Sequence, residues 1–207
     1  MILLTLLAAL SFAPAAHAGF TNHAESIESL RPEREMRALV AQVLSMTGLH
    51  NDVTVVIDPG AEGCAYATTT RQGKQYIGVD LDCVGPLVTA GRYNWRAVGI
   101  LCHEIAHLLG GDTTRLASSH REESEADEWA GWAMARLGAT LPEAKTVFET
   151  FSVQGSKTHP PRAARLASVA RGWSKAQAEK AATPSVPPGR NAWERFLRSP
   201  LPWASEN

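Results

Sequence analysis

Apolar residues recur at intervals of three and four positions in several stretches of this chain, which predicts a mostly helical protein. The first stretch lies between Pro32 and Gly48. Its apolar positions are Met36, Leu39, Val40, Val43 and Leu44. Proline suits the first turn of a helix and glycine suits its end. We therefore expect a helix between these two residues that covers one side of the core.

Between residues 52 and 81 the pattern changes to short runs that are rich in β-branched and aromatic residues. The first run, Asp52 to Ile57, ends at an Asp-Pro-Gly turn. The second, Cys64 to Thr70, is joined by a polar turn to the third, Gln75 to Leu81. These runs predict a small, largely antiparallel sheet of about three strands.

Two strong helix patterns follow the predicted strands. After Gly85 the helical pattern returns, and Asn94 is a suitable N-cap for a helix that ends at Gly110. Its predicted buried stripe is Val98, Leu101, Ile105 and Leu108. The next helix begins at Ser119, where Ser-x-x-Glu forms a capping box, and continues to Gly138.

The last third of the chain predicts further helices and then a linker. Helical segments are expected from Thr140 and around residues 166–170, whereas residues 182–190 are rich in Pro, Ser and Gly. We expect an α+β domain at residues 19–181 and a linker and tail at 182–207. The tail contains Trp193 and Trp203 and either docks on the domain, contacts a partner or frays.

Composition narrows the class of protein. With 207 residues, 44% hydrophobic residues and a net charge of −1, the chain suits one folded domain without a nucleic-acid partner. Residues 1–18 contain an apolar run and end in Ala-His-Ala, which predicts a signal peptide cleaved before Gly19, although no basic residue precedes the run. The alternatives are a buried N-terminal helix or a membrane anchor, and Pro14 disfavours the anchor. Cleavage places the protein in the periplasm or outside the cell.

Three cysteines leave at least one free thiol in an oxidising compartment. Cys64 and Cys83 flank the predicted hairpin and are the more plausible disulfide pair. Cys102 lies inside the central predicted helix, where we expect it to pack as a small apolar residue. Its side chain points about 100° away from that of His103, which makes it a poor metal ligand.

The central predicted helix carries His103-Glu104-Ile105-Ala106-His107 in an apolar setting. Residues four apart share a helix face, so His103 and His107 can hold one metal ion. Glu104 is adjacent and can reach a water molecule on that ion. A catalytic zinc site needs a third protein ligand. Thr113 occupies the position where a metzincin has its third histidine, which excludes that class.

The remaining candidates for the third ligand are acids on the following helix. They are Glu122, Glu123, Glu125 and Asp127. Glu123 shares a helix face with the apolar positions 126 and 130. Glu122 is needed in the capping box. Glu125 lies about 200° around the helix from Glu123. Asp127 is one turn after Glu123 and can orient a ligating imidazole. The alternative is that these acids form a solvated face.

The order of three motifs resembles the HtpX and CAAX prenyl protease family of gluzincins. These motifs are His-Glu-x-x-His at 103–107, Glu-x-x-Ala-Asp at 123–127, and His159-Pro160 followed by Arg165. The resemblance covers about residues 50–170. It implies Zn²⁺ bound by His103, His107 and Glu123, with Glu104 as the catalytic base. It also implies that His159 and Arg165 lie near the cleft, where they stabilise the oxyanion or orient substrate.

The resemblance is to exported members without transmembrane helices, and it implies that residues 64–67 form an edge strand that binds substrate by strand addition. The sequence therefore predicts a zinc endopeptidase that hydrolyses peptide bonds of envelope or extracellular proteins. One alternative is a latent or inactive zincin that acts as an envelope chaperone, assembly or binding factor, with His159 or Cys102 closing the fourth zinc position. Another is a hydrolase of non-peptide amides.

Overall fold

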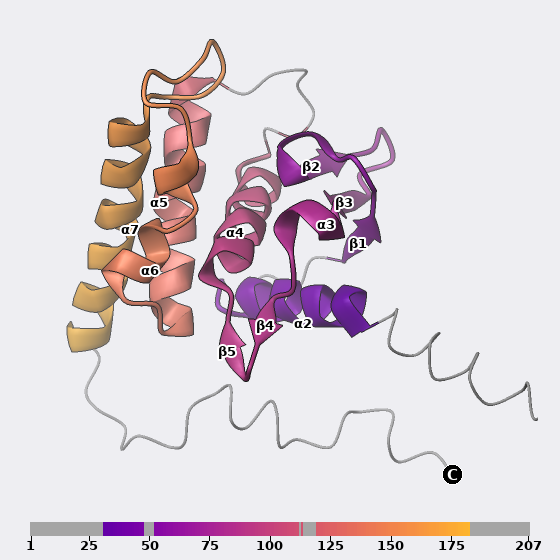
Figure 1. Cartoon of the computed structure of the whole chain (residues 1–207), viewed down its shortest axis with the longest axis horizontal. Helices are drawn as coiled ribbons and strands as arrows, with labels where there is room; N and C mark the ends of the chain where they lie inside the picture. The colour runs from indigo at the N-terminus through magenta and orange to yellow at the C-terminus, as the bar shows by residue number, and fades with distance from the viewer. Residues whose placement is uncertain (1–30, 48–51, 112, 114–118, 183–207) are drawn as a thin grey trace, which may run out of the picture.

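The computed structural model describes residues 31–47, 52–111, 113 and 119–182 (Figure 1). Its helices are α2 (Arg31–Ser45), α3 (Leu81–Val84), α4 (Trp95–Gly110), α5 (His120–Leu137), α6 (Leu141–Lys145) and α7 (Arg162–Ala182), with 3₁₀ turns η1 (Glu62–Cys64) and η2 (Phe148–Thr150). Its strands are β1 (Val53–Ile57), β2 (Ala65–Thr69), β3 (Gln75–Val79), β4 (Val88–Thr89) and β5 (Arg92–Tyr93). The predicted mostly helical α+β composition is confirmed. The predicted signal peptide and all but the first residue of the predicted linker and tail lie outside the described residues.

The three-stranded sheet is mixed and not largely antiparallel. Its strand order is β1-β3-β2, with β3 parallel to β1 and antiparallel to β2. The chain between β1 and β2 passes the position of β3, and the β2–β3 hairpin then returns β3 to the place beside β1. Strand β2 runs opposite to β1, and the hairpin reverses the chain again, so β3 runs in the direction of β1. The antiparallel prediction is therefore wrong for the β1–β3 pair and right for the β2–β3 hairpin.

The segment between β3 and α4 also differs from the prediction. Strand β3 ends at Val79, because Asp80 accepts hydrogen bonds from the backbone of residues 82 and 83 and starts the short helix α3. The predicted helix after Gly85 is absent, and the small β4–β5 hairpin occupies this segment. Asn94 does stand at the N-cap of α4, but its side chain donates to the carbonyl of Pro86 and does not cap the helix.

The cysteines are arranged as the sequence predicts. Cys64 and Cys83 form a disulfide that joins η1, directly before β2, to α3, with their Cα atoms 5.2 Å apart. Cys102 is a free thiol with no exposed surface. Burial raises the pKa of this thiol to about 12, so Cys102 stays protonated and packs as an apolar residue.

Helix α4 is the centre of the fold. Figure 1 shows it between the three-stranded sheet and the α5–α7 pair, with α2 running below α4 and the sheet in this view. Its predicted stripe is fully confirmed as buried: Val98, Leu101, Ile105 and Leu108. The helix ends at Gly110, as predicted, and Gly111 caps it in a left-handed conformation. Over the described ranges, no helix is long and apolar enough to cross a bilayer.

Helices α5 and α7 pack closely because two glycines face the opposite backbone. A Cβ atom on Gly131 would overlap the carbonyl oxygen of Val169, and one on Gly172 would overlap that of Glu128. The separation of the two helices is therefore limited by backbone contact, which leaves little freedom in how α7 lies against α5.

We expect Gly172→Ala to destabilise the protein by about 1–3 kcal/mol, because the added methyl group forces the backbones of α5 and α7 apart. Urea unfolding measures this difference in the free energy of unfolding. Ser174→Ala is the matched control, since Ser174 is exposed on the same helix. Equal stability of the two variants would show that the α5–α7 contact is not tight.

Candidate metal centre

Two histidines of α4 form the first part of the site. His103 and His107 are one turn apart on the helix, and their Nε2 atoms lie 3.0 Å from each other. Both are buried, with exposed fractions of 9% and 7%. The i, i+4 spacing therefore brings the two imidazoles together as the sequence predicts.

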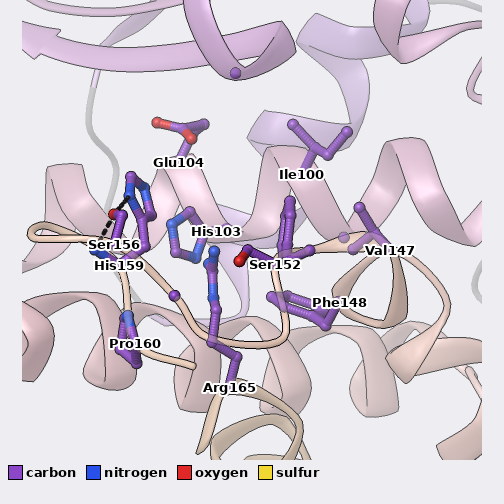
Figure 2. Close-up of a pocket in the computed structure, with 14 residues that line it drawn as sticks. Ile100, His103, Glu104, Val147, Phe148, Ser152, Ser156, His159, Pro160 and Arg165 are labelled. Carbon is purple, nitrogen blue, oxygen red and sulfur yellow. Dashed lines mark hydrogen bonds between the residues drawn. The ribbon is translucent and has the colours of Figure 1, made fainter. Parts of the chain in front are cut away.

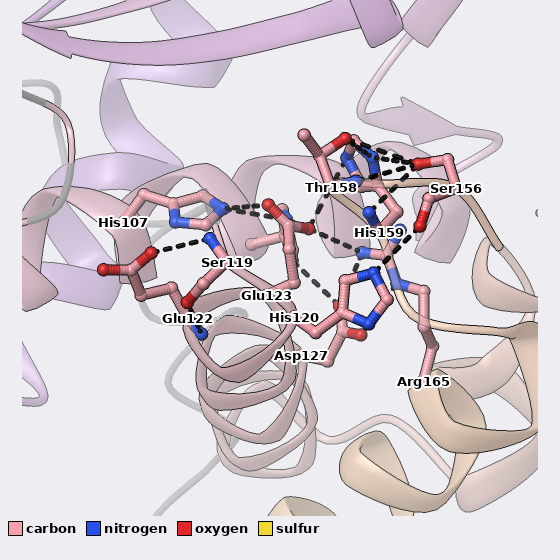
Figure 3. Close-up of polar contacts among 11 residues, drawn as sticks. His107, Ser119, His120, Glu122, Glu123, Asp127, Ser156, Thr158, His159 and Arg165 are labelled. Carbon is pink, nitrogen blue, oxygen red and sulfur yellow. Dashed lines mark hydrogen bonds and ion pairs between the residues drawn. The ribbon is translucent and has the colours of Figure 1, made fainter. Parts of the chain in front are cut away.

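Glu123 approaches the same point from the first turn of α5 (Figure 3). Its Oε2 lies 3.3 Å from Nε2 of His103, and its Oε1 lies 3.4 Å from Nε2 of His107. The neighbouring Glu122 accepts a hydrogen bond from the backbone of Ser119 and completes the predicted capping box. The capping box fixes the residue at which α5 begins, and this start places Glu123 against α4.

The group fits a metal ion. The ligand atoms of His103, His107 and Glu123 all lie within 4.8 Å of one another. Metal–ligand bonds of about 2.0–2.1 Å in a tetrahedron place ligand atoms about 3.4 Å apart, close to the separations found here. Oε2 of Glu123 is buried and makes no hydrogen bond within the described residues, only longer ion-pair contacts with His103 at 3.3 Å and with His159 and Arg165 at 3.6 Å. A cation satisfies this atom, so the group could bind a metal ion.

Asp127 contacts the imidazole of His103, and Arg165 contacts Asp127. Oδ1 of Asp127 lies 2.9 Å from Nδ1 of His103, on the side of the ring opposite the ligand atom. Arg165 donates from Nε and Nη2 to the two carboxylate oxygens of Asp127, each at 2.7 Å. The predicted orienting position of Asp127 is therefore present. Arg165 lines the cavity beside the site, but both of these hydrogen bonds go to Asp127.

His159 lies at the rim of the site. Its side chain is half exposed, and its Nε2 is 3.6 Å from Oε2 of Glu123. The loop that carries it is attached to α5 by His120, whose Nε2 lies 2.8 Å from the carbonyl oxygen of Ser156. Within the described chain, the metal-ligand group contains neither His159 nor Cys102. Whether His159 contacts substrate stays a prediction.

Glu104 is adjacent to the ligands and faces a cavity. Burial raises the pKa of its carboxyl, while His103 and His107 act in the opposite direction. The backbone amide of Ala67, on β2, donates a hydrogen bond to this carboxylate. Glu104 is therefore held between the two histidines and the sheet, with its carboxylate beside the cavity.

The cavity has a volume of about 340 Å³ and opens beside His103 and Glu104 (Figure 2). Its wall is mainly apolar: Gly99, Ile100, Val147, Phe148 and Phe151. The loop of residues 152–160 forms its polar rim. The sequence contained a signal for Ile100, which precedes His103 by one helical turn and shares its face. The sequence did not indicate that Phe148 of η2 lines the cavity, because this depends on how the chain after α6 packs against α4.

The electrostatics of the metal-free site make metal binding dependent on pH. Burial lowers the pKa of His103, but the contacts with Asp127 and Glu123 outweigh this effect and raise the pKa above its ordinary value, to about 10. The imidazole is therefore protonated at neutral pH. Because this pKa lies above the ordinary value, the proton stabilises the metal-free fold fully below about pH 6.5, and the stabilisation is lost as pH rises through about 10.

We expect the affinity for a divalent metal ion to rise about tenfold per pH unit between about pH 7 and pH 9, because the ion must displace the proton on His103. Isothermal titration calorimetry in buffers of different ionisation enthalpy should show about one proton released per ion. Binding without proton release would contradict the assignment of His103 as a ligand that is protonated in the free protein.

The chain matches no protein-family model, no curated protein and no solved structure at a significant level. The resemblance to the HtpX family therefore rests on the three motifs alone.

Proposed function

We propose that this chain is a zinc-dependent endopeptidase that uses the group of His103, His107 and Glu123 to hold zinc. The observation that carries the proposal is the position of Glu104. It is adjacent to the three ligands, faces an accessible cavity, and is not needed as a ligand itself. A purely structural metal site has no use for a carboxylate placed there.

Two imidazole nitrogens and one carboxylate oxygen form a ligand set typical of catalytic zinc, which keeps a further position for water. Zinc held by His103, His107 and Glu123 would supply Lewis-acid chemistry, acidifying a water molecule and polarising the scissile carbonyl. Glu104 accepts a proton from the water during attack and then donates it to the leaving amine. Burial of Glu104 raises its pKa and makes it a stronger proton acceptor.

The edge of β2 offers a place for the substrate backbone. Backbone bonds to β3 at both ends of the hairpin, Asp80 to Cys64 and Thr70 to Lys74, set the alternation along β2. The backbone groups of residues 65, 67 and 69 consequently face away from β3, and among them the amide of Ala67 donates to Glu104. An extended peptide can add to this edge and pass Glu104, with one of its side chains in the apolar cavity.

Incubation with an unfolded protein and a peptide library, followed by mass spectrometry of the products, tests the proposal. We expect cleavage next to large apolar residues, loss of cleavage with a chelator, and recovery when zinc is added. The predicted signal peptide points to envelope or extracellular proteins as the natural substrates. Cleavage that persists in the metal-free protein would refute the proposal.

A latent or non-cleaving zincin that serves as a chaperone, assembly or binding factor is the second candidate, and the observation that favours it is the 3.6 Å contact of His159 with Glu123. A small movement of this loop would bring the imidazole to the metal and close the site. His159→Ala separates the two cases, since peptide cleavage should rise if His159 blocks the metal and fall if it assists the reaction.

A further inference from the structure

Arg165 is distant in sequence from His103, Glu123 and Asp127, yet it is almost completely buried beside them. Its exposed fraction is 3%, and that of its partner Asp127 is 0%. Both Nε and Nη2 donate to this carboxylate at 2.7 Å, which is the paired geometry that arginine forms best. The guanidinium group therefore faces Asp127 and has little surface left for a substrate.

The same carboxylate oxygen connects Arg165 to the metal ligands. Oδ1 of Asp127 accepts from Nη2 of Arg165 and also lies 2.9 Å from Nδ1 of His103. A ligating imidazole is commonly oriented by a carboxylate on its second nitrogen. Here that carboxylate is itself held in place by two hydrogen bonds from α7.

Aromatic packing fixes the guanidinium group on its other side. The Cζ atom of Arg165 lies 4.3 Å from the ring centroid of Phe151 and 5.5 Å from that of Phe148. Both distances suit cation–π contacts, which are stronger for a desolvated cation. Nη2 also lies 3.6 Å from Oε2 of Glu123, so the positive charge offsets two buried carboxylates.

From these contacts we infer that Arg165 is a positioning residue of the metal centre, which holds Asp127 and through it the imidazole of His103. The contacts form a chain from α7 through α5 to α4. This inference rests on the proposed metal site, and it differs from the substrate-binding or oxyanion role that the motif resemblance implies for Arg165.

Zinc titration of the full chain tests the inference, with Arg165→Met and Arg165→Lys as variants. We expect about 10–100-fold weaker zinc binding in Arg165→Met, because loss of a supporting partner of a ligand has effects of this size. Arg165→Lys should weaken binding about tenfold, because lysine keeps the charge and loses the paired geometry. Arg171→Met is the matched control, since Arg171 lies on the same helix in an exposed pair with Glu128, and it should change affinity less than about twofold.

A double-mutant cycle and a spectroscopic measurement separate positioning from general destabilisation. If Arg165 acts through Asp127, the pair Asp127→Asn and Arg165→Met should cost no more zinc affinity than the more harmful single change. The visible spectrum of the cobalt-substituted protein should shift in Arg165→Lys even where that variant stays folded, because the ligand geometry changes.

Two outcomes overturn the inference. Unchanged zinc affinity and cobalt spectrum in both Arg165 variants would show that Arg165 does not position the ligands, and additive losses with Asp127→Asn would show that it acts independently of Asp127. Failure of the unmodified chain to bind zinc or cobalt is a different result, which would refute the proposed metal site itself.

Discussion

Replacement of Glu104 with Gln is expected to lower peptide cleavage by at least about a thousandfold and to leave the metal bound. Glutamine has nearly the shape of glutamate, but its amide cannot accept and return a proton during the reaction. The three residues that could hold the metal do not include Glu104, so the binding group remains complete. The loss should therefore appear in kcat and not in metal content.

Metal analysis and a fluorogenic peptide assay on the same preparation measure both quantities. Glu125→Gln provides a control of identical chemistry, because Glu125 is an exposed acid whose side chain contacts Arg121 on the surface of α5. It should keep full activity. A Glu104→Gln protein that retains a tenth of the original rate would rule out Glu104 as the base.

Removal of one ligand should have an equally large effect, on stability as well as on activity. In the unmodified protein, zinc at about 1,000 times its dissociation constant should stabilise the fold by about 4 kcal/mol. We expect His107→Ala to lose nearly all of this stabilisation, because a histidine and a carboxylate alone bind zinc weakly. Cleavage should disappear with it.

Thermal unfolding with zinc and with a chelator measures this difference as a change in Tm. The Tm of the unmodified protein should fall when the chelator is added, while the Tm of His107→Ala should be the same in both conditions. His120→Ala is a suitable control, since His120 is close to the site and outside the ligand group. Zinc stabilisation that survives in His107→Ala would disprove the assigned ligand set.

The sequence predicted that His103, His107 and Glu123 lie together, as a group that could bind a metal ion, because each part of this arrangement depends on local geometry. The spacing of His103 and His107 places both side chains on one helix face. The helical period turns the side chain of Glu123 toward α4, while Glu122 serves the capping box. The capping box made this assignment reliable, since it fixed the residue at which α5 begins. Tertiary structure had only to bring two well-defined helix faces together.

The sequence could not predict features that depend on contacts between distant segments. The direction of β3 relative to β1 follows from the order of strands in space, which turn sequences between neighbours do not specify. Arg165 was placed near the site by its motif, but its partner lies 38 residues earlier in the chain. The apolar cavity likewise arises where α4 meets the segment after α6.

The buried thiol of Cys102 can report local unfolding of the core around α4. The other two cysteines form the disulfide, so this is the single free thiol of the 207-residue chain, and because it is buried a labelling reagent can reach it only when α4 leaves the core. Its position directly before His103 links that reporter to the metal. A metal ion that holds His103 and His107 to Glu123 should slow the labelling, so the state of the site can be followed without any substrate.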